Sequence, residues 1–481
     1  NKLCYYYDNG GYEMVDFFRE IQTSLFREWN NNQKRDYYHL HQSETDPDAI
    51  IIENEYCYSY VTFNPQCIIE LCVMNKRTDE MAFYLHFQFK TLKHAISLFE
   101  EMDQCIKKMV DQPMCRLLLC CSGGMTTAFF ADKIKNGIKV LNLNMEVAAT
   151  SYQKIYNVAQ NYDVILLAPQ VSYVKLQVEK VFKNKLVLKI PTQIFASYNV
   201  GALITFVEES LKHKENKYNG YVEPLASMME IKTNKNVLAV SINANGENSH
   251  ISYRLYNSHQ DIVLDSNIIK SNIKLQDVLD ALDTVVLQNE MIDVISIALP
   301  GVMVEGNVYS GIIEGGNHQL KERLEKRYEK EIYLINDVNA AVVGYYASQN
   351  EYKSLAFLFQ PIGRMAGSGI IVSGQLIRGM DHLAGEVALL PLNLSDAYLT
   401  LANTPEGTLE LVTKNIMSII AIVAPEAIVV YSDLILDSQD VSDEIKKSLS
   451  QYSLKVYPKV IKVENILEYI LLGAMILSAK E

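Results

Sequence analysis

A cysteine stands directly before a serine and two glycines in the stretch LLLCCSGGMTTAFF, residues 117–130. The apolar run at its start predicts a buried strand, which would carry Cys121 to the edge of a sheet. The glycines allow successive backbone N–H groups to point inward, and Thr126 or Thr127 can cap the helix that follows. Inward amides and a helix N-terminus bind anions and also stabilise a thiolate. We therefore predict that Cys121 is a nucleophile within a phosphate-binding loop.

The predicted phosphate-binding loop comprises Ser122, Gly123, Gly124, Met125, Thr126 and Thr127. A thiolate in such a loop indicates chemistry through a cysteinyl phosphate. Tyrosine phosphatases use a related loop that ends in an arginine, and this loop has none. Holding a phosphoryl group and passing it on is therefore favoured over hydrolysis. The alternative is a tight glycine turn beside a buried cysteine that acts only as a small apolar residue.

Four strand-like apolar runs alternate with helical runs between residues 113 and 213. This alternation predicts a small four-stranded parallel sheet flanked by helices. Ligands of such sheets bind outside the carboxyl ends of the strands, and Cys121 would stand at that end of the first strand. Pro169, Gln170 and Tyr173 follow the third strand, so we expect them at the same edge.

Two motifs of this unit resemble the enzyme IIB component of the lactose/cellobiose/chitobiose branch of the bacterial sugar phosphotransferase system (PTS). The family pattern Cys-x-x-Gly-Met-Ser/Thr-Thr corresponds to Cys121–Thr127. The pattern Leu-Leu-Gly-Pro-Gln-x-x-Tyr corresponds to Leu166–Tyr173, with Ala168 in place of the glycine. The resemblance implies that Cys121, rather than Cys120, accepts a phosphoryl group from a phosphohistidine on a IIA partner. It also implies onward transfer to a sugar bound in a membrane IIC channel, which would be a further partner.

Residues 236–481 resemble the ROK family of sugar kinases and sugar-responsive repressors, which has an actin-like ATPase fold. The stretches SIALPGVMVEGNV, YLINDVNAAVVG and GSGIIVSGQLIRGMDHLAGEV carry the resemblance. It implies that Asn336, Asp337 and Glu386 bind a carbohydrate or sugar phosphate through its hydroxyls. Asp337 would be the base if the chain acts as a kinase. The local sequence alone favours a different role for Asp337, as a cap for a helix that follows a strand.

The sequence departs from the ROK pattern where kinases of that family hold ATP. The stretch VSINANGENS lacks the first phosphate turn, Gly363-Arg364-Met365 replaces the second, and Tyr431-Ser432 replaces the glycine pair that admits adenosine. Bulky side chains there obstruct close backbone approach to a nucleotide. Leu389 stands where the family has a histidine, and the zinc-binding cysteine cluster is absent. These departures predict an eroded ATP site, no cofactor and no metal, and they argue against ATP-dependent kinase activity.

Composition and charge exclude several classes of protein. The net charge of −13 over 481 residues argues against nonspecific nucleic-acid binding, which needs a basic face. No apolar run is long enough to span a bilayer, and the first residues lack the pattern of a secretion signal. All eight cysteines lie between Cys4 and Cys121 without a CxxC pair, which favours a reducing cytoplasm.

The fold class expected from these patterns is α/β. We expect an α+β domain of unknown role at 1–112, a IIB-like phosphocysteine domain at 113–213, a linker at 214–235 and a ROK-like sugar-kinase fold at 236–481. The favoured function is a cytoplasmic regulator or sensor of the sugar PTS that takes a phosphoryl group on Cys121 and carries a carbohydrate-binding ROK-like domain. ROK relatives are often dimers, so we also expect a homodimer.

Three alternative functions stay open at this point. The chain could be an active IIB phosphocarrier, a divergent ROK sugar kinase or a sugar-responsive transcriptional regulator. ROK repressors carry an N-terminal helix-turn-helix, whereas residues 1–112 are strand-rich and lack a basic recognition helix. DNA binding is therefore not favoured.

Overall fold

The computed structural model describes most of the chain, in two compact units. The described residues are 7–76, 80–111, 115–123, 125–141, 143, 145–183, 185–212, 233–245, 248–304, 307–309, 313–314, 320–380, 383–450 and 457–480. The first unit comprises Asn1–Gln112, Asn234–Ile295 and Ser310–Ile332, and the second comprises Pro113–Thr233, Ser296–Tyr309 and Tyr333–Glu481. Both units combine helices and strands, so the expected α/β fold class is confirmed.

A large sheet runs through segments that lie far apart in the chain. Its strands have the order β1-β2-β3-β4-β5-β12-β11-β10-β14-β18. An antiparallel meander forms its beginning: β1 (His39–Gln42), β2 (Ala49–Glu53), β3 (Cys57–Asn64), β4 (Ile68–Asn75) and β5 (Glu80–Gln88). The later strands are β10 (Val237–Asn245), β11 (Asn248–Tyr256), β12 (Ile262–Lys270), β14 (Val294–Leu299) and β18 (Glu331–Asn336). Because β5 pairs antiparallel with β12, the segment before residue 112 shares one sheet with the segment after residue 234.

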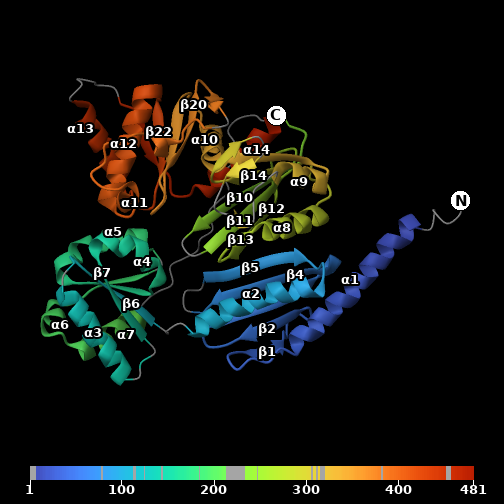
Figure 1. Cartoon of the computed structure of the whole chain (residues 1–481), viewed down its shortest axis with the longest axis horizontal. Helices are drawn as coiled ribbons and strands as arrows, with labels where there is room; N and C mark the ends of the chain where they lie inside the picture. Colours follow the sequence, from blue (N-terminus) through green and yellow to red (C-terminus); the bar gives the residue numbers. More distant parts are fainter. Residues whose placement is uncertain are drawn as a thin grey trace. The chain divides into compact units, whose positions relative to one another are not determined.

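Two helices accompany the meander, α1 (Tyr7–Asn31) and α2 (Leu92–Asp111). Figure 1 shows α2 lying along the face of the sheet formed by β1–β5. Its buried apolar residues follow the expected helical spacing: Ala95, Leu98, Phe99, Met102 and Ile106. Trp29 of α1 packs edge-on against Phe99, with 5.2 Å between the ring centroids. Trp29 is the one tryptophan of the chain, so its fluorescence reports on this packing.

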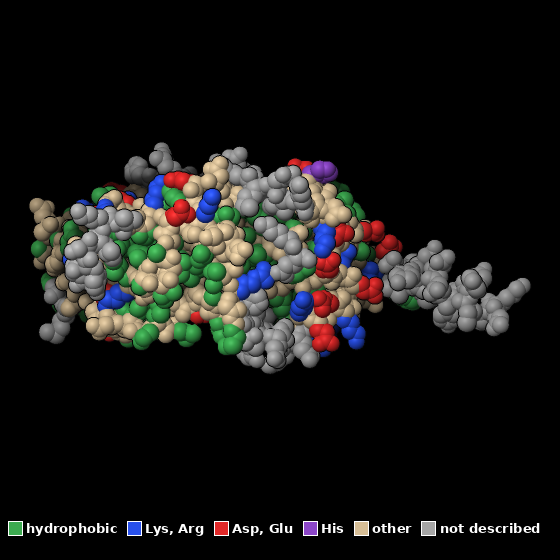
Figure 2. All heavy atoms as spheres, turned by 90° about the horizontal axis from the view of Figure 1, so that it is seen from above, with side chains coloured by type: hydrophobic (Ala, Val, Ile, Leu, Met, Phe, Trp, Pro, Cys, Tyr) green, Lys and Arg blue, Asp and Glu red, His purple; other side chains and the backbone are tan. Residues whose placement is uncertain are grey.

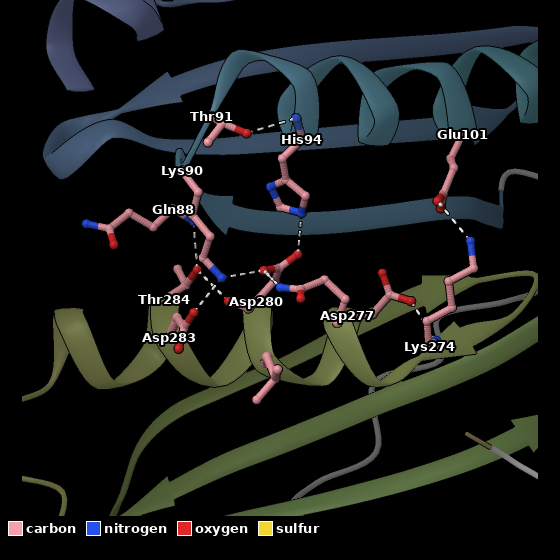
Figure 3. Close-up of polar contacts among 12 residues, drawn as sticks. Gln88, Lys90, Thr91, His94, Glu101, Lys274, Asp277, Asp280, Asp283 and Thr284 are labelled. Carbon is pink, nitrogen blue, oxygen red and sulfur yellow. Dashed lines mark hydrogen bonds and ion pairs between the residues drawn. The ribbon is translucent and has the colours of Figure 1, made fainter. Parts of the chain in front are cut away.

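A charged cluster joins the N-terminal segment to α8 (Leu275–Gln288), as Figure 3 shows. Lys90 Nζ lies 2.6 Å from Asp280 Oδ1 and 2.5 Å from Asp283 Oδ2. His94 Nε2 lies 2.9 Å from Asp280 Oδ2. Burial alone would raise the pKa of Asp280, but the contacts with His94 and Lys90 lower it below its ordinary value. The folded state therefore favours the ionised form of this carboxyl.

Lys90→Met is expected to destabilise the first unit by about 2 kcal/mol at neutral pH, because the buried carboxylate of Asp280 loses a cation while the partly buried Asp283 keeps only Arg327. A carboxyl with a depressed folded-state pKa contributes stability above its unfolded pKa of about 3.9, and that stability is lost as the pH falls through the folded-state pKa. The cost of the substitution should therefore shrink below about pH 4. Urea unfolding followed by Trp29 fluorescence measures the effect. Lys107→Met, at an exposed position of α2, is the control, and equal unfolding midpoints for the two variants at neutral pH would contradict the prediction.

The second unit contains the four-stranded parallel sheet expected from residues 113–213. Its strands have the order β7-β6-β8-β9, and every pairing is parallel. They are β6 (Cys115–Cys121), β7 (Met145–Ser151), β8 (Val164–Leu167) and β9 (Leu186–Lys189). The helices of this domain are α3 (Met125–Val140), α4 (Ile155–Val158), α5 (Lys175–Val181), α6 (Thr192–Ser197) and α7 (Val200–Lys212). Strands and helices alternate because a buried parallel sheet needs helices over its faces.

A five-stranded sheet forms the core of the C-terminal lobe, which we define as residues 333–481. The sheet has the order β21-β20-β19-β22-β23. Its strands are β19 (Leu355–Phe359), β20 (Gly367–Val372), β21 (Gln375–Leu376), β22 (Ala427–Tyr431) and β23 (Lys459–Lys462). The helices of the lobe are α10 (Asp337–Ala347), α11 (Tyr398–Leu401), α12 (Pro405–Val423), α13 (Ser438–Ser450) and α14 (Leu467–Lys480). Helices α10 and α14 can pack closely because Gly344 has no side chain. A Cβ atom at this position would lie only 1.9 Å from the carbonyl oxygen of Tyr469.

Short elements complete the described part of the chain. They are β13 (Ile273–Lys274), β15 (Val302–Val304), β16 (Asn307–Tyr309), β17 (Ile313–Glu314) and α9 (Leu320–Tyr328). On the face drawn in Figure 2, Lys and Arg side chains are interspersed with Asp and Glu. Within the described ranges, no helix is both long enough and apolar enough to cross a membrane.

Candidate functional site

Cys121 ends β6 at the carboxyl edge of the four-stranded sheet. It pairs with Ser151 at the end of β7, while its neighbour Cys120 pairs with the last residue of β8. Pro169 follows β8 and begins the 3₁₀ helix η4 (Pro169–Val174). The structure therefore brings Cys121 and the Pro169 motif to one edge, where parallel sheets bind their ligands.

The backbone at Gly123 turns toward the sulfur of Cys121. Its N–H donates a hydrogen bond to Cys121 Sγ over 3.2 Å. Gly123 has a φ of +98°, a conformation that favours glycine, and a Cβ atom there would lie 3.7 Å from Ser151 Cβ. Cys121 is 5% exposed, whereas Ser122 and Gly123 are exposed. The turn thus directs one backbone N–H at the sulfur of Cys121, and the two residues that follow Cys121 are exposed to solvent.

Part of the predicted phosphate-binding loop lies outside the described residues. This holds for Gly124 and for the side chains of Met125, Thr126 and Thr127. The backbone from Met125 onward forms α3, so the chain passes from the loop directly into a helix N-terminus. A helix N-terminus at this place adds positive partial charge near Cys121.

The two adjacent cysteines have different environments. Cys120 is fully buried, and burial, followed by the neighbouring Cys121, raises the pKa of its thiol to about 12. Such a thiol stays protonated at neutral pH and is a poor nucleophile. Cys121 instead has an amide donor at its sulfur and an exposed residue after it. This difference favours Cys121 as the nucleophile of the pair.

The predicted sugar-binding residue Asn336 is the N-cap of α10. Its Oδ1 accepts hydrogen bonds from the N–H groups of Val338 and Asn339, both over 3.0 Å. Its Nδ2 donates to the carbonyl oxygen of Gly301 over 3.2 Å. Asn336 therefore holds the helix start and the Pro-Gly turn together, and Asp337 is the first residue of the helix rather than its cap.

Asp337 is a buried carboxyl whose charge interacts with that of Glu386. Burial raises the pKa of Asp337 to about 6 and the charge of Glu386 adds to the increase, while the N–H of Val338, 2.9 Å from Oδ1, opposes it. Burial also raises the pKa of Glu386. Two carboxyls that interact electrostatically thus both have raised pKa values, a feature that is common at functional sites.

The backbone around Glu386 fits closely against β20. Gly385 has a φ of +93°, and a Cβ atom there would lie 1.8 Å from the carbonyl oxygen of Ser368. The N–H of Ser368 donates to the carbonyl oxygen of Gly385 over 2.9 Å. The Ala-Gly-Glu motif therefore needs glycine at its centre to hold Glu386 at this position.

Asp337→Asn is expected to raise the free energy of unfolding at neutral pH by up to about 3 kcal/mol, because ionising a carboxyl with a pKa raised by roughly two units costs the folded state that much. A folded-state pKa of about 6 lies above the unfolded value, so the cost is present above that pH and vanishes as the pH falls toward about 4. Unfolding measured at neutral pH and near pH 4 checks both statements. Asp443→Asn, exposed on α13, is the matched control. A gain that persists at low pH would contradict the assignment.

Protein groups fill the turn that corresponds to the second ATP contact. The N–H of Gly363 donates to the carbonyl oxygen of Ala402 over 2.9 Å. A Cβ atom at Gly363 would lie 2.7 Å from Asn403 Oδ1. The N–H of Ala366 donates to the hydroxyl of Tyr398 over 3.2 Å. Both amides are thus engaged within the chain, so neither is directed at a free phosphate site.

The structure also describes two of the other residues that depart from the kinase pattern, Tyr431 and Leu389. Tyr431 packs against Phe359, with 5.5 Å between ring centroids, and Leu389 is 78% exposed. The first phosphate turn at 246–247 lies outside the described residues, as do the side chains at 244 and 245. In the described part of the chain, no three His, Cys, Asp or Glu side chains gather as metal ligands would.

Two contacts near these sites involve residues that the sequence analysis did not single out. The hydroxyl of Tyr152 donates to Glu406 Oε1 over 3.0 Å, between positions 254 apart in the chain. Asn403 occupies the space beside Gly363. No local pattern marks such long-range pairs. A local signal did exist for the capping role of Asn336, because asparagine is among the preferred N-cap residues.

Two family models match the chain and confirm both resemblances. The model of the PTS system, Lactose/Cellobiose specific IIB subunit, matches residues 116–205, and the ROK family model matches residues 246–408. The oligo-beta-mannoside-specific EIIB component of the PTS from Bacillus subtilis (strain 168) is 30% identical over 67 residues, which are 14% of this chain. The chain covers 65% of the length of that relative.

Solved structures with similar parts include members of both groups. A ROK family protein from Streptococcus pneumoniae TIGR4 in complex with sucrose is 18% identical, and the match covers 50% of this chain and 97% of that one, with a TM-score of 0.41. The lactose-specific IIB component domain from Streptococcus pneumoniae is 23% identical and covers 20% of this chain and 95% of that one, with a TM-score of 0.18. The chain therefore joins a IIB-type segment to a ROK-type segment, as the family models show.

Proposed function

We propose that this chain is a sugar-PTS-linked regulator that accepts a phosphoryl group on Cys121. The observation that carries the proposal is the contrast between two adjacent cysteines. Both side chains are buried in the same apolar cluster, but burial raises the pKa of Cys120, whereas Cys121 ends β6 with the N–H of Gly123 on its sulfur. The presence of a IIB-type segment and a ROK-type segment in one chain supports a role linked to sugars and the PTS. Because the relay proteins of that system act in the cytoplasm, we place the chain there.

The proposed reaction takes a phosphoryl group from a phosphohistidine on a IIA protein. The Cys121 thiol gives its proton to solvent, and the thiolate attacks phosphorus. The sulfur–phosphorus bond forms as the phosphorus–nitrogen bond breaks, and the released imidazole nitrogen takes up a proton. The amide of Gly123 and the N-terminus of α3 stabilise the transferred negative charge. Tyr173, which is 74% exposed beside the same edge, offers a surface to the incoming partner.

In this proposal the ROK-type segment binds a carbohydrate or sugar phosphate and no longer uses ATP. The amides of Gly363 and Ala366 already donate to groups of the chain, which supports an eroded nucleotide site. Asp337 and Glu386 keep raised pKa values and proximity, which supports a polar ligand site. A homodimer remains a prediction.

The same cysteine also supports a second candidate, an active IIB phosphocarrier. That function requires onward transfer from Cys121 to a sugar bound in a IIC channel. Membrane vesicles that contain a IIC protein, mixed with the phosphorylated chain, distinguish the two. Formation of a sugar phosphate identifies a carrier, and its absence with stable phosphocysteine identifies a regulator.

Incubation of the full chain with phosphoenolpyruvate, the general PTS proteins and a IIA protein of the lactose/cellobiose branch is expected to add one phosphoryl group to Cys121. Intact-mass spectrometry and peptide mapping detect and locate it. Cys120→Ala is the matched control and should keep the modification, whereas Cys121→Ala should lose it entirely. An unmodified wild-type chain, or modification of Cys121→Ala at the wild-type level, would refute the proposal.

Hexoses or hexose phosphates are expected to raise the melting temperature of the full chain, because the Asp337–Glu386 site binds hydroxyl groups. With Glu386→Gln, the same shift should need at least about tenfold more ligand, whereas Glu444→Gln, at a half-exposed position of α13, should leave the required ligand concentration unchanged. ATP should neither shift the melting temperature nor yield ADP with any of these sugars. ADP formation that is abolished in Asp337→Asn would instead show a working kinase.

A further inference from the structure

The IIB-type domain and the C-terminal lobe belong to the same compact unit and share an apolar contact. Leu434, which follows β22, is 2% exposed and belongs to the buried apolar cluster of the four-stranded sheet. Ile362, which precedes the turn at Gly363, packs against the same cluster. Both residues lie next to places where the sequence lacks the glycines expected around a nucleotide. The surface of the lobe near those places is therefore in contact with the IIB-type domain.

A polar contact lies beside the phosphate-binding loop. Ser151 is the strand partner of Cys121, and Tyr152 is the next residue along the chain. The hydroxyl of Tyr152 donates to Glu406 Oε1, which belongs to the first turn of α12. The carboxylate of Glu406 thus contacts the residue that directly follows the strand partner of Cys121.

The raised pKa values of Tyr152 and Tyr156 reflect, besides burial, an electrostatic interaction with Glu406. Burial raises the pKa of Tyr152, and the charge of Glu406 and their hydrogen bond raise it further, so the hydroxyl keeps its proton at neutral pH. The pKa of Tyr156 is raised mainly by burial and by Tyr152, with a smaller contribution from Glu406. A second polar contact between the IIB-type domain and the lobe lies two residues after α5, where Lys183 Nζ is 3.6 Å from Glu464 Oε2. The negative charge of Glu406 is therefore felt within the IIB-type domain.

A phosphoryl group on Cys121 would change the charge at this place. Phosphorylated side chains carry a charge of about −1.5 to −2 at neutral pH. Ser122 and Gly123 are exposed, so these two residues are accessible to a phosphoryl donor while the lobe contact is formed. The added charge would have the same sign as the carboxylate of Glu406, which is bonded to Tyr152, the residue after the strand partner of Cys121. Like charges repel, and because Glu406 is exposed to solvent the repulsion is reduced by salt.

We propose that the contact of Leu434, Ile362 and the Tyr152–Glu406 pair, which we name the lobe contact, is a switch controlled by phosphorylation. The IIB-type domain is docked on the C-terminal lobe while Cys121 is unmodified, and the phosphoryl group weakens docking by repelling Glu406. The surface around Ile362 and Leu434 is then exposed. This inference rests on the proposed function, because it assumes that Cys121 is the phosphoryl acceptor. Beyond that function, it explains how phosphorylation of Cys121 affects the ROK-type segment.

Hydrogen exchange of the full chain, followed by mass spectrometry, tests the switch without a IIA protein. Cys121→Asp supplies a negative charge at the sulfur position, and Cys121→Asn is its neutral match. Amides of residues 404–410 and 175–181 should exchange at least about fivefold faster in the Asp variant than in the Asn variant. Leu434→Asp removes the apolar anchor and defines the exchange rates of the open state.

A second pair of variants covers the case in which substitution at Cys121 loosens the domain itself. Ser122→Asp and Ser122→Asn place the same difference in charge on an exposed residue of the loop. Exchange in β8 should stay equal within this pair, whereas exchange at 404–410 should again differ. When Glu406→Gln is added to both variants, the difference in exchange rate at residues 404–410 between the Asp and Asn variants should fall to less than half.

The outcomes separate the switch from the proposed function. Equal exchange at 404–410 in both Asp/Asn pairs overturns the switch, even if Cys121 is phosphorylated in the relay experiment. A charge effect that Glu406→Gln leaves intact also overturns it, because repulsion of Glu406 is then not the cause. A charge effect that depends on Glu406 supports the switch. If the relay then fails to modify Cys121, the phosphoryl acceptor role is refuted while the electrostatic coupling stands.

Discussion

The backbone conformation of Gly123 is the constraint on which the proposed phosphoryl site depends. Its positive φ turns an N–H group onto Cys121 Sγ, and a residue with a side chain adopts that φ only at a cost. The parallel sheet supplies the rest, because β6 and β7 must end at one edge for Cys121 and Ser151 to lie side by side. Amides are fixed dipoles, so they attract a phosphoryl group without binding it as tightly as a full cation would. Such a site suits transfer better than storage.

The C-terminal lobe uses its backbone amides in the opposite way. At Gly363 the N–H that could face a phosphate donates to the carbonyl oxygen of Ala402, and Asn403 takes up the remaining space. The pKa values of Asp337 and Glu386, in contrast, are both raised, mainly by burial, and the charge of Glu386 adds to the increase at Asp337. In our proposal the lobe keeps groups that suit a polyhydroxylated ligand, while the amides of Gly363 and Ala366 donate to groups of the chain. That division supports ligand sensing over catalysis, because kinases depend on amides directed at the transferred phosphate.

The four-stranded sheet could be predicted from the sequence because each of its elements is specified locally, by an apolar strand or by a helical spacing. The N-cap was harder to assign. Asparagine and aspartate are both good caps, and α10 begins one residue earlier than a cap at Asp337 would place it, so Asn336 takes the role expected for Asp337. The pairing of β5 with β12 follows from no local pattern, since any compatible sheet edge can accept a strand. The Tyr152–Glu406 contact is hidden for the same reason.

The lobe contact is weak enough to be controlled by one charge. Its apolar anchor, Leu434, contributes at most about 3 kcal/mol if its burial is credited entirely to docking. The Tyr152–Glu406 hydrogen bond is exposed to solvent and adds at most on the order of 1 kcal/mol. Coupling free energies between sites in proteins are typically about 1–3 kcal/mol. A switch works only when the coupling and the contact are of similar size, because a much stronger contact would never open and a much weaker one would never close. The residues that define the lobe contact meet that condition.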